Sequence, residues 1–209
     1  MFILPGAAAE RGEEIGRGWA ASLSMGAGQF CTNPGIIVVM EGETADKLID
    51  AAKVALAGAA PQTMLTDGIA VAYQEGQKRI SQTPGVRSVL TSVCDQRQAT
   101  PYLYETDGST WLADRSLGHE VFGPLGLIVK VSDFEQMLEA AKYLDGQLTC
   151  TLHTTDDDLE YGCALMPILT RKAGRVLANA YPTGVEVCDA MVHGGPYPAS
   201  TNFGATSVG

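Results

Sequence analysis

The sequence lacks the features of membrane and secreted proteins. No run approaches the ~18 consecutive apolar residues that a membrane-spanning helix needs. Four apolar residues precede Pro5, and no basic segment stands ahead of them, which is atypical of a secretory signal peptide. We therefore expect a protein that has no membrane partner.

Positive charge is scarce. The chain has 14 Lys and Arg residues against 24 Asp and Glu residues, and its formal net charge is −10 at pH 7. The basic residues are scattered, whereas binding to nucleic-acid phosphates needs clusters of them. This balance argues against a nucleic-acid partner, and the acidic excess is attributed to solubility.

Cysteines are few and isolated. The five cysteines stand far apart, are odd in number and include no Cys-x-x-Cys pair. This spacing supports neither a disulfide framework nor a zinc site, and it favours a reducing, cytoplasmic location. Asp156, Asp157 and Asp158 could suggest a site for a hard cation. The start of a helix explains these acids as well, so no metal ligand is predicted.

What the sequence does contain is an alternation of apolar strands and amphipathic helices. Its 45% apolar and 18% charged residues are typical of a packed globular protein. The apolar runs Ile36–Met40 and Leu125–Val131 predict strands that are buried on both faces. Strands alternating with helices predict an α/β fold, with a mostly parallel sheet and helices on both faces. No repeat or linker is visible, so one domain spanning residues 1–209 is expected.

The other expected elements follow from the same patterns. Further strands are expected at Phe2–Leu4, Val86–Thr91, Leu148–His153, Arg175–Ala178 and Gly184–Cys188. Helices are expected at Glu10–Met25, Thr44–Ala57, Asp67–Gln82, Asp133–Leu144 and Asp156–Ala173. Thr44 and Ser132 are expected to cap two of them, with Glu135 at the capping-box position. Gln96–Asp107 is expected to be extended and to end in a turn at Gly108.

Cys31 stands in a tightly shaped, glycine-rich turn. The segment Gly26–Gly35, GAGQFCTNPG, lies between an expected helix and an expected strand. Glycine permits positive φ and close approach, and Pro34 fixes the exit of the turn. A thiol beside backbone N–H donors has what a covalent nucleophile needs. The same pattern also fits a small, inert, buried residue in a helix-to-strand turn.

Two later segments could accompany Cys31. The segment GHEVFGP ends at Pro124, just before a buried strand, and alternation points Glu120 and Phe122 the same way with Val121 opposite. An acid beside an aromatic ring could hold ribose hydroxyls and a flat ring. The alternative is an ordinary turn with a solvated Glu and a core Phe. The loop at residues 193–200 is either a shaped binding loop or a plain surface loop.

Taken together, these motifs resemble the aldehyde dehydrogenase superfamily. The matching segments are Gly28–Thr32 (GQFCT) with Pro34–Gly35, Glu120–Pro124 (EVFGP) and Gly194–Pro196 (GGP). The opening Phe2–Pro5 is similar to the segment that follows the family's Glu-Leu-Gly motif. Residues 29–35 and 193–202 most resemble the 2,5-dioxovalerate (α-ketoglutarate semialdehyde) dehydrogenases, and the resemblance covers essentially the whole chain.

The resemblance implies oxidation of a small semialdehyde to its acid with NADP or NAD as the cofactor of the full-length enzyme. Cys31 would attack the aldehyde to give a thiohemiacetal and then a thioester, and its backbone N–H would be half of an oxyanion hole. Glu120 would hold the nicotinamide ribose and Phe122 would contact the nicotinamide. Phe30 and Tyr197 would lie on the substrate side.

The resemblance also implies that the chain is one part of such an enzyme. It corresponds to the catalytic domain, truncated at both ends, without the family's glutamate base, oxyanion-hole side-chain amide and nucleotide-binding domain. No Gly-rich nucleotide fingerprint follows a strand in this sequence. We therefore expect that the isolated chain binds no cofactor and is inactive as a dehydrogenase. Faces left bare would favour a homo-oligomer.

Two functions of other classes remain open. A cysteine hydrolase would need a base near Cys31, and His193 is the candidate because it lies in a loop. In a non-catalytic interaction domain, Cys31 would only pack. Alkylation of Cys31 that is no faster than that of Cys94 or Cys188 would favour the interaction domain.

Overall fold

A computed structural model describes residues 1–93, 97–184 and 194–198. In these residues a seven-stranded sheet has the order β4-β6-β7-β2-β1-β8-β9, and two short strands form a separate sheet, β3-β5. The large sheet is parallel except for the β4–β6 pair. The predicted mostly parallel α/β fold is therefore confirmed.

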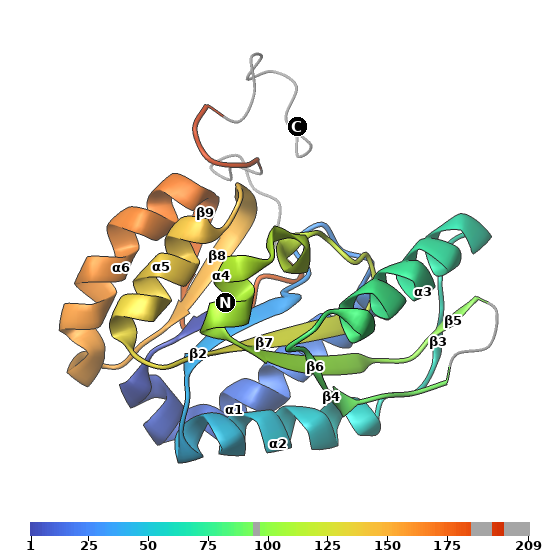
Figure 1. The fold of residues 1–209 in the computed structure, drawn as a ribbon, viewed down its shortest axis with the longest axis horizontal. Coiled ribbons are helices and arrows are strands. Elements are labelled where there is room, and N and C mark those ends of the chain that lie inside the picture. The colour runs from blue at the N-terminus through green and yellow to red at the C-terminus, as the bar shows by residue number, and fades with distance from the viewer. Residues whose placement is uncertain (94–96, 185–193, 199–209) are drawn as a thin grey trace.

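The strands and helices alternate along the chain (Figure 1). The strands are β1 (Phe2–Ile3), β2 (Ile36–Met40), β3 (Gln62–Thr63), β4 (Arg87–Leu90), β5 (Gln98–Ala99), β6 (Tyr102–Asp107), β7 (Leu125–Val131), β8 (Gln147–His153) and β9 (Ala173–Ala178). The α-helices are α1 (Pro5–Ser24), α2 (Glu43–Ala57), α3 (Asp67–Gln82), α4 (Gly108–Ala113), α5 (Phe134–Tyr143) and α6 (Leu159–Lys172). Short 3₁₀ helices are η1 (Met25–Gly28), η2 (Arg115–Gly118) and η3 (Asp156–Asp158).

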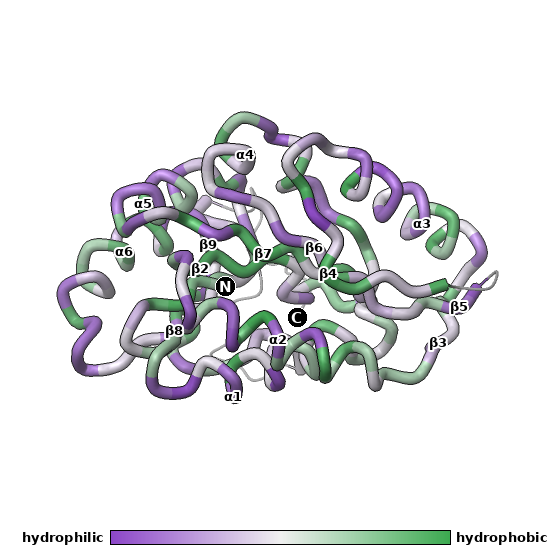
Figure 2. The backbone as a smooth tube through the Cα atoms, turned by 60° about the horizontal axis from the view of Figure 1, so that its bottom comes forward, coloured by the Kyte–Doolittle hydropathy of each residue, from purple (hydrophilic) through white to green (hydrophobic). Residues whose placement is uncertain are grey.

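Helices cover both faces of the sheet. Helices α1 and α2 pack on one face, and α3 to α6 pack on the other (Figure 1). Side chains of β2 alternate between the two cores, with Ile37 and Val39 on the α1 side and Val38 on the other. Figure 2 shows β7 as a hydrophobic strand in the middle of the molecule. Within the described ranges, no helix is both long enough and apolar enough to cross a bilayer.

Two predicted helix caps are wrong. Helix α2 begins at Glu43, with Gly42 as its N-cap residue, so Thr44 lies inside the first turn. Helix α5 is capped by Asp133, whose Oδ1 accepts a hydrogen bond from the Gln136 N–H at 2.8 Å. Ser132 instead donates its hydroxyl to the Asp133 carboxylate at 3.0 Å. An adjacent carboxylate therefore takes the capping position that the sequence pattern gave to the serine.

Other predicted boundaries also shift. Helix α1 begins at Pro5 rather than at Glu10, because proline suits the first turn, where its missing N–H is not needed. The turn expected at Gly108 opens the short helix α4, which Asp107 caps through the Thr110 N–H at 2.7 Å. Except for Gly184, the strand expected at residues 184–188 lies outside the described residues.

A buried carboxylate lies at the carboxyl edge of the sheet. Neighbouring strands β1 and β8 lead to helices on opposite faces, which is the arrangement where open α/β sheets usually bind ligands. Here Asp158 binds main-chain N–H groups at both helix starts. Its Oδ1 accepts from the Gly6 N–H at 2.7 Å, and its Oδ2 accepts from the N–H groups of Ala7 and Thr155 at 3.0 Å each. The side chain is almost fully buried.

Candidate active site

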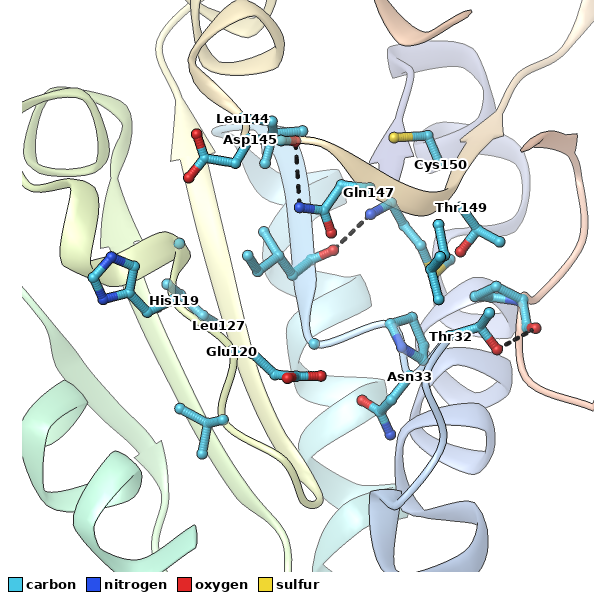
Figure 3. A pocket seen from close by; sticks show the side chains of 18 of the residues that line it. Thr32, Asn33, His119, Glu120, Leu127, Leu144, Asp145, Gln147, Thr149 and Cys150 are labelled. Atoms are coloured by element: carbon cyan, nitrogen blue, oxygen red, sulfur yellow. Dashed lines mark hydrogen bonds between the residues drawn. The ribbon is translucent and has the colours of Figure 1, made fainter. Parts of the chain in front are cut away.

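A cavity of about 790 Å³ lies at the opposite, amino edge of the parallel strands (Figure 3). The loops that precede β2, β7 and β8 form its walls together with the start of β1. The first loop contributes Cys31, the second contributes Glu120 and Phe122, and the third contributes Asp145. The structure therefore brings the predicted nucleophile and both predicted cofactor-binding residues to one cavity.

The loop that carries Cys31 leaves α1 through a left-handed turn. Gly26, Ala27 and Gly28 have φ values of 56°, 57° and 65°. The two glycines adopt this conformation without a steric penalty, as the sequence predicted, whereas Ala27 is a strained exception. The Cys31 side chain beyond the turn is exposed and lines the cavity.

Three hydrogen bonds hold the Cys31 loop to its surroundings. The buried Trp19 indole donates to the Pro34 carbonyl at 2.6 Å, and the Thr32 hydroxyl donates to the Pro182 carbonyl at 3.0 Å. The side-chain amide of Asn33 donates to the main chain of α1 at 2.8 Å. The three residues that follow the thiol are thus fixed to the body of the domain.

The loop before β7 carries Glu120 and Phe122 to the entrance of that strand. Strand β7 begins only at Leu125, and Glu120, Val121 and Phe122 all line the cavity. The Val121 side chain also packs against Gly76 of α3 and the core on that face, so the predicted alternation of Val121 with Glu120 and Phe122 stays a prediction. Glu120 is exposed, and its carboxylate points into the cavity in Figure 3.

Tyr73 of α3 packs against this loop and forms a hydrogen bond next to it. Its ring packs directly against Gly123, at a position that leaves no room for a Cβ atom there. Its hydroxyl donates to the Thr100 carbonyl at 2.9 Å and lies 3.3 Å from the Pro124 carbonyl. The glycine of the EVFGP segment is therefore required by a buried aromatic ring.

The wall formed by the start of β8 had no signal in the sequence. Asp145 pairs with Arg115 at 3.5 Å, and Gln147 donates to the Asp145 carbonyl at 3.4 Å. Further along β8, Cys150 lines the cavity but is buried, and burial raises the pKa of its thiol. Of these two thiols, only that of Cys31 is exposed.

Phe30 and Tyr197 are not among the described residues that line the cavity. Phe30 is 37% exposed, and its ring covers Gly26, where a Cβ would lie 2.7 Å from a ring carbon. Tyr197 is 87% exposed. The preceding Pro196 lies beside Gly146 in the third wall, so the GGP segment is near the cavity.

Some predicted features remain open. His193 and the last two residues of the loop at residues 193–200 lie outside the described residues. In the described ranges, no group of three or more His, Cys, Asp or Glu side chains is placed to hold a metal ion. Of the three consecutive acids, Asp156 and Asp157 are exposed, and Asp158 binds main-chain N–H groups as described above.

Comparison with curated proteins finds close relatives along the whole chain. The chain is 46% identical over 211 residues to alpha-ketoglutaric semialdehyde dehydrogenase 2 of Azospirillum brasilense. It is 40% identical over 212 residues to the alpha-ketoglutaric semialdehyde dehydrogenase of Acinetobacter baylyi. Both alignments cover 100% of this chain, and the chain spans 40% of the length of each relative. No protein-family model matches the chain.

Solved structures with the same fold are aldehyde dehydrogenases. Aldehyde dehydrogenase 21 of Physcomitrella patens, in complex with succinate, has a TM-score of 0.75 at 18% identity, over 93% of this chain and 40% of its own. Succinic semialdehyde dehydrogenase of Streptococcus pyogenes, in complex with NADP⁺, has a TM-score of 0.72 at 20% identity, over 93% of this chain and 42% of its own. At such identities the likeness shows the fold. By sequence along its whole length and by fold, the chain belongs to the aldehyde dehydrogenase superfamily.

Proposed function

We propose that this chain forms the catalytic-domain part of an NAD(P)-dependent aldehyde dehydrogenase that uses Cys31 as its nucleophile. The observation that carries the proposal is the shared cavity of Cys31, Glu120 and Phe122. The proposed substrate is 2,5-dioxovalerate (α-ketoglutarate semialdehyde), because two relatives that align with the whole chain are named for it. A reducing, cytoplasmic location suits a nucleophilic thiol.

The proposed chemistry begins at the exposed sulfur. The Cys31 thiolate attacks the aldehyde carbon, a C–S bond forms, and the carbonyl oxygen becomes the oxyanion of a thiohemiacetal. The backbone N–H of Cys31 donates to this oxyanion. When bound, NAD(P) supplies the hydride acceptor for the oxidation. Loss of hydride leaves a thioester on Cys31, and attack by water then releases the acid and restores the thiol.

The second loop has the side chains that a nicotinamide riboside needs. Ribose hydroxyls are hydrogen-bond donors, and the exposed Glu120 carboxylate offers only acceptors. The partly buried Phe122 provides an apolar ring for a flat heterocycle. Phe30 and Tyr197 are retained as proposed substrate-side residues because they flank the Cys31 loop and the third wall, respectively.

The nucleophile is tested by aldehyde protection of the thiol. Iodoacetamide labelling of the purified chain is followed by peptide mass spectrometry, with and without succinic semialdehyde. The exposed Cys163 on α6 is the internal control. We expect the aldehyde to slow labelling of Cys31 and not of Cys163. Equal protection of both thiols, or protection of neither, would contradict the proposed role of Cys31.

The dehydrogenase activity of the chain itself is tested separately. Because the chain spans 40% of the length of its relatives, we propose that the 209 residues alone do not reduce NAD(P). Sustained formation of NADPH or NADH from this chain and a semialdehyde would contradict this expectation. We also propose self-association, and a monomer seen by light scattering at tens of micromolar would count against it.

A further inference from the structure

The turn that precedes the Cys31 loop is held in an unfavourable conformation. Left-handed residues ordinarily occur singly, yet Gly26, Ala27 and Gly28 adopt this conformation in succession. Ala27 has a Cβ atom that crowds its own main chain in this region, and it is buried. A strained turn of this kind persists only when its surroundings stabilise it.

The support comes from a side chain far away in the sequence. Gln62 lies on β3 of the small two-stranded sheet, and its side-chain amide reaches the turn. Its Oε1 accepts a hydrogen bond from the Ala27 N–H at 2.9 Å, and its Nε2 donates to the Ser24 carbonyl at 2.8 Å. Both polar ends of the amide are used, so one side chain binds the turn before and within its left-handed part.

A second glutamine, on the turn side, reaches back to the segment that follows β3. Gln29 follows the turn, and its Nε2 donates to the Gly26 carbonyl at 3.2 Å. Its Oε1 accepts from the N–H of Leu65, just beyond β3, at 2.9 Å. Strand β3 is itself fixed, because Gln62 pairs with Ala99 of β5. Two glutamines therefore link the left-handed turn to the small sheet from both sides.

We propose that Gln62 is a positioning residue for Cys31. It holds the left-handed turn, and the turn sets the position from which Cys31 presents its thiol and its backbone N–H to the cavity. Only Gln29 and Phe30 separate the turn from Cys31, so relaxation of the turn changes the placement of both groups. This inference rests on the proposed role of Cys31 as the nucleophile.

The test measures how well an aldehyde protects Cys31 in the full 209-residue chain. The readout is the concentration of succinic semialdehyde that halves the iodoacetamide labelling rate of Cys31, with Cys163 as the internal reference. For Gln62→Ala we expect this concentration to rise about 5- to 30-fold, the range set by losing the support of one strained residue. The matched control is Gln98→Ala on β5, an exposed glutamine of the same small sheet, and it should leave the value unchanged.

A rescue separates positioning from general stability. Glycine accepts positive φ without strain, so Ala27→Gly should return the Gln62→Ala protein to within about twofold of the original value. Gln62→Glu keeps an acceptor for Ala27 but places a carboxylate oxygen against the Ser24 carbonyl, so it should also weaken protection. If Gln62→Ala fails to fold, Gln62→Glu is used to measure the protection of Cys31.

The possible outcomes distinguish the role of Cys31 from the role of Gln62. If the unmodified chain shows no selective protection of Cys31, the proposed nucleophile is wrong, and the role of Gln62 fails with it. If the unmodified chain is protected but Gln62 variants match it within twofold, the nucleophile stands and Gln62 is not a positioning residue. If Ala27→Gly fails to restore protection to a folded Gln62→Ala protein, the left-handed turn is not the route by which Gln62 acts, and the proposal is overturned.

Discussion

Gly28 and Gly123 bring the main chains of the two functional loops into direct contact. A Cβ atom on Gly28 would lie 2.5 Å from the Pro124 nitrogen, closer than real Cβ atoms approach other heavy atoms. Because Cys31 and Glu120 lie within a few residues of this contact, their separation across the cavity depends on it. The glycines of two motifs that are distant in the sequence therefore serve one packing contact.

Substitution of Gly28 by alanine should destabilise the protein and weaken protection of Cys31 by an aldehyde. The new Cβ meets the second loop, and alanine is strained at the φ of 65°. We expect a loss of about 2–4 kcal/mol in the free energy of unfolding, measured by urea denaturation. Gly35→Ala is the matched control, because a Cβ there lies 3.5 Å from the Leu125 carbonyl, an ordinary contact. Equal losses in the two variants would refute this account.

We expect the indole N–H of Trp19 to contribute to the free energy of unfolding beyond the packing of its ring. Its N–H donates to the Pro34 carbonyl at 2.6 Å, in a fully buried position next to the Cys31 loop. Trp19→Phe leaves that buried carbonyl without its donor, at an expected cost of roughly 1–3 kcal/mol beyond the loss of packing. Trp111 is equally buried, but in the described structure its indole N–H has no hydrogen-bond partner.

The comparison of the two tryptophans isolates the hydrogen bond. Trp111→Phe removes a similar volume and breaks no hydrogen bond, so we expect Trp19→Phe to lower the free energy of unfolding by at least about 1 kcal/mol more. Thermal and urea unfolding of both variants measure the difference. If Trp111→Phe is the more damaging change, the hydrogen bond to Pro34 does not anchor the loop as described.

Regular periodicity allowed much of the fold to be predicted from the sequence. Ile36–Met40, Leu125–Val131 and Asp67–Gln82 have the predicted bounds, because continuous apolar runs and a clear amphipathic stripe define them. Helix α4 was missed because six residues are too few to show helical periodicity. The Cys31 and Glu120 loops were found because their glycines, proline and reactive side chains form recognisable motifs.

The supporting residues could not be found in the same way. Gln62 stands in a short segment between two helices that carries no motif, and its role depends on the left-handed turn that the fold places beside it. The β8 wall of the cavity is assembled by sheet order, which the local sequence does not encode. Asp158 belongs to a run of three acids that the sequence explains equally well as an ordinary helix start. The N–H groups of Gly6 and Ala7, together with the capping box that Asp158 forms with Thr155, distinguish it from its neighbours.

Asp158 should therefore differ sharply from the adjacent Asp157. Asp158→Ala removes the acceptor for main-chain N–H groups of Gly6, Ala7 and Thr155, so we expect it to lower the free energy of unfolding by about 3 kcal/mol or more. The exposed Asp157 at the same helix start is the control, and Asp157→Ala should cost less than about 1 kcal/mol. Urea denaturation at pH 7 measures both, and similar costs would show that the buried carboxylate does not stabilise the start of α1.

His153 provides a pH-dependent contribution to stability. It is 1% exposed, neither ring nitrogen has a hydrogen-bond partner in the described structure, and the ring lies 5.4 Å from that of Tyr181. Burial, with a smaller effect of the Arg11 charge, lowers the pKa of His153 from 6.5 to about 4. Between these values the unfolded chain binds a proton that the folded protein excludes. Stability is therefore present above pH 6.5 and is lost as the pH falls towards 4.

We expect this one histidine to account for about 3 kcal/mol of the loss in the free energy of unfolding between pH 6.5 and pH 4. Acidic residues also titrate in this range, so the measurement is the difference between the original protein and His153→Leu, followed by urea denaturation at each pH. The two curves should diverge on acidification, with His153→Leu the more stable protein at pH 4.5. His119→Gln is the control, because it removes an imidazole from an exposed position, and its curve should diverge from the original far less than that of His153→Leu. Parallel curves for His153→Leu and the original protein would show that the buried imidazole accepts its proton without unfolding.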